Sequence, residues 1–239
     1  MSSNYLSVRY HTLSGSIIDM SKNPKKRNKP KKNKNHLPRS VMFRKRKSLQ
    51  TLQFSNYSIT YDALERTRFP EEVEEQFKEL HDLVYSDPLE AIPRLKALKA
   101  KYPEIRELYN WLFAALSKNE QLEEADAIVK ENYQKHPDYL FAKLNYAEFC
   151  LRKGNFEEVP IILEQKFDLK MLYPDRDIFH ITEVVGFFGV TGLYFLESGQ
   201  IEAAKTCFNL LQDIAPDSSV TSKLMLKLAP FLFRELLGF

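Results

Sequence analysis

The prolines of this chain recur at a spacing that strongly limits its fold. Pro103, Pro137 and Pro174 stand 34 and 37 residues apart, and Pro216 follows 42 residues later. Each closes a stretch in which apolar residues recur at three- and four-residue steps, as on one face of a helix. A period near 34 in such sequence indicates stacked pairs of helices. The sequence therefore predicts an all-α chain of repeated helix pairs.

A second spacing places the break inside each pair. Turn residues precede three of these prolines by the same 17 positions: Ser86 before Pro103, Glu120 before Pro137 and Gly199 before Pro216. At the first break, Asp87 can cap the following helix, with Pro88 at its first position. The third unit is longer than the others. We expect residues 164–184 to form a longer helix or a loop.

These features resemble tetratricopeptide repeats (TPR), a family with a 34-residue period, small residues where helices approach and a proline after the second helix. The fourth unit shows the pattern best, with Gly192, Gly199, Ala204 and Pro216 in the corresponding places. The resemblance covers about residues 72–218. It implies a right-handed α-solenoid of about four helix pairs.

Composition divides the chain into four parts. Residues 1–49 read as a disordered, strongly basic arm, and 50–69 as a linker, a short helix or an extended strap on the body. Residues 70–218 form the predicted helix pairs, and 219–239 a capping helix. The sequence from Met20 onward looks like the natural start of the protein, so we expect translation to start there instead of at Met1.

The charge asymmetry is large. Residues 1–47 contain 14 Lys and Arg against one acidic residue, whereas residues 48–239 contain 21 against 31. Like charges at this density repel, and few apolar residues are present to offset the entropy of ordering. The arm could neutralise phosphates in a salt-dependent way, or serve only as a solvated tail. Its cations include Lys25, Lys26, Arg27, Lys31, Lys32, Arg44, Lys45, Arg46 and Lys47.

The C-terminus is unusually apolar for the end of a repeat array. Val220, Leu224 and Leu228 make one stripe, and further apolar residues extend to Phe239. Terminal repeats normally carry a polar outer face. We expect this end to fold back on the body, to self-associate or to bind a permanent partner.

Signals for catalysis are weak. The five histidines are scattered, and the chain has no CxxC motif and no Gly-rich phosphate loop. Cys150 and Cys207 fall on apolar helical faces, where a cysteine is usually a small core residue. We expect no enzymatic activity, no cofactor and no metal. The uncharged and mostly apolar run of 13 residues from Val184 is too short to span a bilayer.

The resemblance also implies where a partner binds. In TPR proteins the first helix of each repeat lines the concave groove, and by register the exposed candidates here are Glu107, Asn110, Trp111, Lys118, Phe141, Asn145, Glu148, Arg152 and Leu193. Trp111, the chain's one Trp, is either a binding hot spot or a cap on the core of its own repeat. Some family members clamp a terminal carboxylate with Lys, Asn and Arg. The basic partners are missing here, so we expect no such clamp.

Three functions fit these features. The first is a non-enzymatic scaffold or adaptor that binds a peptide or protein in the groove. The second is a nucleic-acid- or ribosome-associated protein that binds through the arm, and the third is a secretion-type TPR chaperone. Only two cysteines and no signal peptide favour the cytoplasm, or the nucleus if the organism is a eukaryote.

Overall fold

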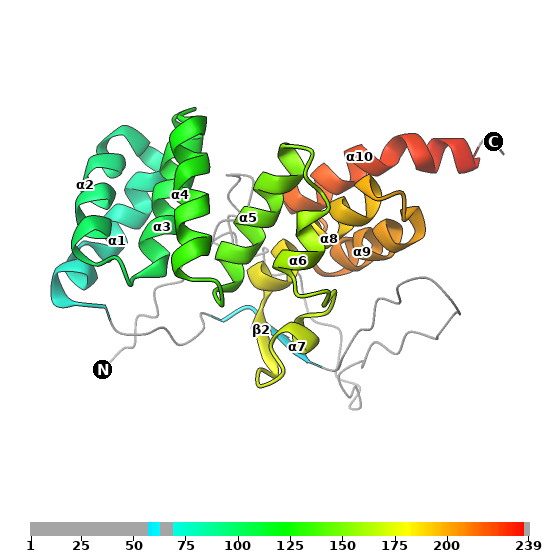
Figure 1. The fold of residues 1–239 in the computed structure, drawn as a ribbon, viewed down its shortest axis with the longest axis horizontal. Helices are drawn as coiled ribbons and strands as arrows, with labels where there is room; N and C mark the ends of the chain where they lie inside the picture. Colours follow the sequence, from blue (N-terminus) through cyan, green and yellow to red (C-terminus); the bar gives the residue numbers. More distant parts are fainter. Residues whose placement is uncertain (1–56, 63–68, 237–239) are drawn as a thin grey trace, which may run out of the picture.

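The computed structural model describes residues 57–62 and 69–236, with side chains placed as far as Phe233. Within these ranges the chain forms ten helices and two short strands (Figure 1). The helices are α1 Glu71–Ser86, α2 Pro88–Lys101, α3 Arg106–Lys118, α4 Leu122–Lys135, α5 Leu140–Arg152, α6 Glu158–Ile162, α7 Leu169–Leu172, α8 Ile181–Glu197, α9 Ile201–Ile214 and α10 Ser219–Leu236. The strands are β1 Ser58–Thr60 and β2 Ile178–His180. Among the described residues, no helix combines the length and the apolar content that crossing a membrane requires.

Local signals in the sequence set the helix ends. Asp87 separates α1 from α2, and its side chain accepts a hydrogen bond of 3.2 Å from the backbone N–H of Glu90, as predicted. Pro88 begins α2, where its missing N–H costs nothing. The repeated prolines instead follow helix ends, at three sites. Helices α2, α4 and α9 each end two residues before Pro103, Pro137 and Pro216.

The helices pack as successive pairs, which confirms the predicted all-α class. The pairs α1 with α2, α3 with α4 and α8 with α9 are each joined by a short turn. Each new pair packs on the preceding one through its first helix (Figure 1). Helix α3 contacts α1 and α2, and α10 contacts α8 and α9 in the same way. We call α1, α3, α5, α8 and α10 the first-helix layer.

The third unit departs from this plan. Its second helix, α6, has only five residues and contains Pro160, and Glu164 and Gln165 follow with positive φ angles of 54° and 56°. The chain then forms the one-turn helix α7 and strand β2 before α8 begins. Of the two forms expected for residues 164–184, the structure shows the irregular one. The reason is that the left-handed backbone at Glu164 and Gln165 cannot continue a right-handed helix.

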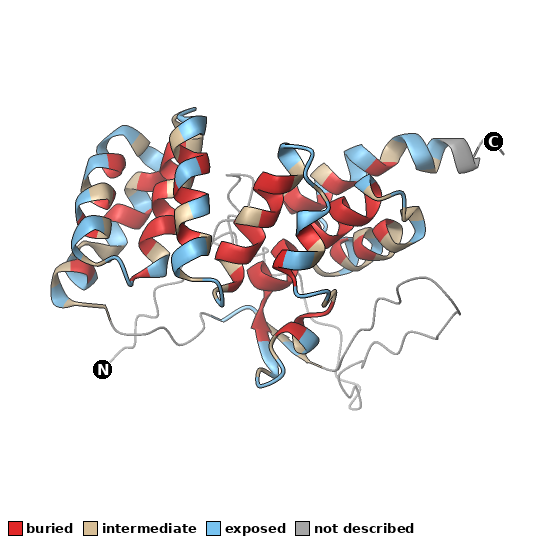
Figure 2. Ribbon diagram, viewed as in Figure 1, coloured by how far each residue is buried: buried red, intermediate tan, exposed pale blue. Residues whose placement is uncertain are grey.

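The buried side chains form two apolar cores (Figure 2). The first core lies within α1 to α4 and extends from Val73 to Ile128 along the chain. The second core begins at Val129 and gathers the side chains of α5 to α10. The boundary falls within α4, whose Ile128 belongs to the first core and whose Val129 belongs to the second. The molecule is therefore one stack of helices with two separate apolar centres.

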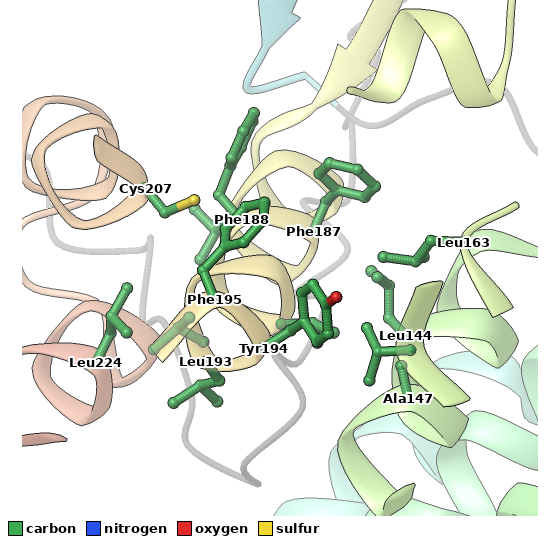
Figure 3. Close-up of a cluster of buried hydrophobic side chains, with 14 of the residues drawn as sticks. Leu144, Ala147, Leu163, Phe187, Phe188, Leu193, Tyr194, Phe195, Cys207 and Leu224 are labelled. Atoms are coloured by element: carbon green, nitrogen blue, oxygen red, sulfur yellow. The ribbon is translucent and has the colours of Figure 1, made fainter. Parts of the chain in front are cut away.

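Helix α8 is the centre of the second core. Every residue from Ile181 to Leu196 is buried, because α8 contacts α5, α9, α10 and both strands. Figure 3 shows its side chains pointing in opposite directions, toward Cys207 and Leu224 on one side and toward Leu144 and Leu163 on the other. A helix that is apolar on all sides can be stable in water only when it is enclosed in this way.

The structure covers the four predicted parts of the chain to different extents. Helix α10 begins at Ser219, and its Val220, Leu224 and Leu228 are buried as the predicted stripe. Residues 1–49, which include the whole basic arm, lie outside the described residues. Of residues 50–69, the structure describes 57–62, which are extended, together with Phe69.

Candidate functional site

A row of aromatic rings crosses the start of the first-helix layer. Phe77, His81 and Tyr85 lie four residues apart on one side of α1. The ring of Trp111, on α3, meets Phe77 edge-on at 4.8 Å and His81 at 6.3 Å between ring centroids. His81 in turn meets Tyr85 at 5.4 Å. We call these four residues the aromatic row.

The aromatic row is partly embedded in the first core. Trp111 keeps 9% of its surface exposed and His81 keeps 8%, whereas Phe77 and Tyr85 are half-buried. The expectation of an exposed Trp111 is wrong, because the rings on α1 cover it; of the two alternatives, the structure shows the cap on the core. A ligand could still reach the row through Phe77 and Tyr85. Aromatic rings with one accessible edge offer large apolar contact at little entropic cost.

A cation lies beside the row. The Nζ atom of Lys118, at the end of α3, sits 5.2 Å from the centre of the Tyr85 ring. A lysine over a tyrosine face gains roughly 0.5–1 kcal/mol at an exposed site. Among the described residues, no carboxylate forms an ion pair with Lys118. Lys118 is partly exposed, so its ammonium group is accessible to a ligand carboxylate beside the Tyr85 ring.

The two asparagines of the predicted groove face inward instead of outward. The Oδ1 atom of Asn110 accepts hydrogen bonds from Asn145 at 3.2 Å and from Asn132 at 3.1 Å. The Nδ2 atom of Asn110 donates to the hydroxyl of Tyr139 at 2.9 Å. Asn145 is buried, so its expected exposure is wrong. We call these four residues the polar seam.

The polar seam joins the two cores. It brings together side chains from α3, α4 and α5 and from the residue that precedes α5. Within the described part of the chain, Oδ1 of Asn132 is the one buried side-chain acceptor without a donor. Each of these hydrogen bonds contributes a net gain of about 1 kcal/mol. Asn110 and Asn145 are bonded to each other, and Asn110 is also bonded to Asn132 and Tyr139, so these amides link neighbouring helices of the stack.

Glu148 and Leu193 are also buried, so the exposure expected for them is wrong. The carboxylate of Glu148, on α5, pairs with Nζ of Lys223 on α10. Burial raises the pKa of Glu148, and Lys223 opposes that shift. Leu193 belongs to the second core beside Leu224 (Figure 3). The physical reason is the same for both, since α10 packs over this end of the layer.

The other groove candidates are more accessible. Arg152 is exposed and donates to the carboxylate of Asp126 at 2.6 Å, and Lys153 pairs with the same carboxylate at 3.0 Å. Burial acts to raise the pKa of Asp126, but these two cations outweigh it and lower the pKa. Glu107 and Phe141 are half-buried, and the Phe141 ring meets Tyr139 edge-on at 5.7 Å.

A feature that the sequence did not predict is a parallel strand pair. Strand β1 pairs with β2 in the register Ser58 to Ile178, Ile59 to Phe179 and Thr60 to His180. The Tyr57 ring meets the buried Phe179 edge-on at 5.1 Å. Tyr57 and Ile59 thereby pack on the second core, while Phe69, seven residues after Asp62, packs on the first. The described residues on the two sides of 63–68 therefore pack on different cores.

Side chains occupy the other edge of β2. The Glu183 carboxylate accepts from the backbone N–H of His180 at 2.9 Å and from both terminal nitrogens of Arg176, at 2.7 and 3.0 Å. Arg176 also donates to the carbonyl of Ile178 at 3.4 Å. Burial lowers the pKa of His180, which begins α8 as its N-cap. These polar groups hold the free edge of β2 and the start of α8 in place.

Nothing in the described residues is arranged for metal or thiol chemistry. Within residues 57–62 and 69–233, no three His, Cys, Asp or Glu side chains gather as a metal site. Cys150 and Cys207 are both buried as free thiols, and burial raises the pKa of each, that of Cys207 to about 12. A thiol that stays protonated is a poor nucleophile. The aromatic row with Lys118 is the candidate site.

Comparison with known proteins adds no relative. No protein-family model matches the chain, and the searches of curated proteins and of solved structures also find no match. The TPR resemblance therefore stays a prediction from the sequence. The candidate site is supported by its own geometry alone.

Proposed function

We propose that this protein is a non-enzymatic interaction scaffold that binds a peptide segment of a partner protein on its first-helix layer. The stack would be a right-handed, TPR-like solenoid that presents this layer as its concave side. The observation that carries the proposal is the aromatic row, with half-exposed Phe77 and Tyr85 around a nearly covered Trp111. Clustered aromatic residues of this kind supply much of the binding energy in protein interfaces.

The chemistry of the row favours one kind of peptide. An apolar or aromatic side chain could pack against the accessible edges of Phe77 and Tyr85. A carboxylate three or four residues further along a helical peptide, or nearer in an extended one, could then pair with Lys118. That pair would be charge-assisted and partly shielded from water by the Tyr85 ring. We therefore expect peptides that combine a large apolar residue with Asp or Glu.

The chain's single Trp supplies the assay. Trp111 lies in the row, so a peptide that binds there changes the polarity around the only indole of the protein. Peptides selected from a random display library on the full chain would be titrated while Trp emission is recorded. We expect a saturable emission shift for peptides with an apolar and an acidic residue.

Matched variants separate the row from general surface effects. Tyr85→Ala and Lys118→Gln should each weaken binding about 5- to 30-fold, as expected for a loss of 1–2 kcal/mol. Lys130→Gln is the control for Lys118, because Lys130 lies over the Phe149 ring at 4.8 Å in the second core. Selected peptides that bind equally well to Tyr85→Ala, Lys118→Gln and the unaltered protein would refute the proposal.

A second candidate function rests on the basic arm. Residues 22–47 carry 13 Lys and Arg residues and no acidic residue, a density that suits phosphate neutralisation. If the arm binds RNA, for example at the ribosome, deletion of residues 20–47 abolishes binding. Affinity of the full chain then falls steeply with salt. The scaffold proposal instead predicts that peptide binding survives the deletion, in a cytoplasmic protein.

A further inference from the structure

Helix α10 has apolar side chains on two opposite sides. Val220, Leu224 and Leu228 face the body and are 6%, 0% and 0% exposed. Leu226 and Phe233 stand seven residues apart, on the side opposite that buried face, and are 69% and 64% exposed. Ala229 and Pro230 lie between them along the helix. We call Leu226, Ala229, Pro230 and Phe233 the outer stripe.

The place of α10 in the stack explains why this side is open. In the pairs that begin with α1, α3 and α8, the first helix is covered by the next helix of the chain. Helix α10 packs on α8 and α9 as a first helix does, yet no helix follows it among the described residues. The outer stripe is therefore the surface on which a further helix would pack. A helix with two apolar sides is characteristic of enclosed positions.

The charges around the stripe favour one occupant. The outer stripe contains no charged residue, and the neighbouring lysines are already neutralised by the body. Lys223 pairs with Glu148, and Lys227 pairs with Glu197 at 3.2 Å. A surface that meets its own copy across a twofold axis has to be self-complementary, and an uncharged apolar stripe satisfies this without like-charge contact. A strongly charged partner would gain nothing from it.

We propose that the outer stripe is an interface at which α10 packs against α10 of a second copy of this chain, antiparallel about a twofold axis. An aromatic side chain such as Phe233 buries roughly 150–250 Å², and with Leu226, Ala229 and Pro230 the outer stripe offers on the order of 300 Å² per copy. About twice that area for the pair is below the roughly 1,000 Å² of a stable interface, so the proposed dimer is a weak and transient one. A reversible dimer with a dissociation constant of about 1–100 µM is therefore expected.

Sedimentation of the full chain over a concentration series tests this proposal. We expect the mass to rise from one chain to two as the concentration passes through about 1–100 µM. Leu226→Glu/Phe233→Glu should hold the protein at one chain, with an unchanged helical circular dichroism signal. The control Leu89→Glu/Leu122→Glu places the same charges on exposed leucines of α2 and α4, and should still dimerise.

A second variant tests the pairing itself if the charged one fails to fold. Ala229→Cys lies midway along the outer stripe, so two copies should join by a disulfide under mild oxidation. Glu90→Cys, on α2, should not. A single-chain mass at about 100 µM would overturn the proposal. A dimer unaffected by the Leu226→Glu/Phe233→Glu change, or Ala229→Cys chains that fail to join, would also overturn it.

Discussion

Replacement of Gly189 by Ala is expected to destabilise the protein, although alanine favours a helix. A Cβ atom at position 189 would lie 2.2 Å from Cγ1 of Val220 and 3.7 Å from its Cβ. Carbon atoms in contact prefer about 3.5–4.0 Å, so one atom must move by about 1.5 Å. Val220 cannot readily turn aside, since a β-branched side chain in a helix has essentially one rotamer. Helix α10 would therefore have to shift on α8.

The magnitudes can be set against each other. Overpacking of a core costs about 1–3 kcal/mol, while Gly→Ala within a helix gains about 1 kcal/mol. The net loss for Gly189→Ala should be about 0–2 kcal/mol, and a contact as close as 2.2 Å favours the upper part of that range. Val220→Ala alone should cost about 1–2 kcal/mol, through the cavity that it leaves. With Val220 already truncated, Gly189→Ala should become stabilising by up to about 1 kcal/mol.

Urea unfolding followed by circular dichroism measures this reversal. The free energy of unfolding would be determined for the unaltered chain, both single variants and the double variant. A double-mutant cycle should give a coupling of about 2 kcal/mol between positions 189 and 220. Additive effects would refute the packing of α10 on α8. Gly154→Ala is no substitute control, because its φ of 80° is itself unfavourable for alanine.

Three further predictions concern other contacts of the second half. Lys223→Met should cost about 2–3 kcal/mol at neutral pH, because it leaves the Glu148 carboxylate buried and unpaired. Burial raises the folded-state pKa of Glu148, so the folded protein favours the protonated acid. The stability lost in Lys223→Met should therefore shrink as pH falls below that pKa and return as pH rises. Adding Glu148→Gln should remove the pH dependence of this loss. Phe179→Ala should lower the free energy of unfolding by about 3–5 kcal/mol, because it removes the buried ring on which the β1–β2 pair packs. Tyr61 is 58% exposed, so Tyr61→Ala should change the free energy of unfolding by no more than about 0.5 kcal/mol in the same urea assay. The Cys207 thiol, with a pKa raised by burial to about 12, should react with a thiol reagent only at the rate of unfolding, and rapid labelling of two thiols per folded chain would contradict its burial.

Much of the fold could be predicted from local signals. The prolines fix where α2, α4 and α9 end, and the Asp87 cap fixes where α2 begins. The stripe of Val220, Leu224 and Leu228 correctly gives the buried side of α10. These features depend on residues close together in the chain, where helical periodicity and capping act directly.

The strand pair could not be predicted, because nothing local specifies it. Strands β1 and β2 have three residues each and are about 120 positions apart, too short to show a period. The sequence left a linker, a short helix and an extended strap as alternatives for residues 50–69. The choice between them depends on Phe179, a residue of the irregular third unit, whose side chain packs against Tyr57.

Only part of the candidate site could be drawn from the sequence. The register of a repeat predicted Trp111 and Lys118 on the first helix of a pair, and both lie in α3, but it did not predict Phe77, His81 or Tyr85 as site residues. The register could not show that Phe77 and His81 cover Trp111, because that contact depends on how closely α1 packs against α3. For the same reason Asn110 and Asn145 seemed available for a ligand, although they bond to each other across the polar seam.

Hydrogen exchange with and without a selected peptide tests the central claim most directly. If the peptide binds the aromatic row, amide exchange should slow in the segments that contain α1 and α3, residues 71–86 and 106–118, with little change in α9. Binding at a helix surface suppresses the local opening through which amides exchange. Slower exchange confined to residues 20–47, with α1 and α3 unaffected, would contradict the claim and assign binding to the basic arm.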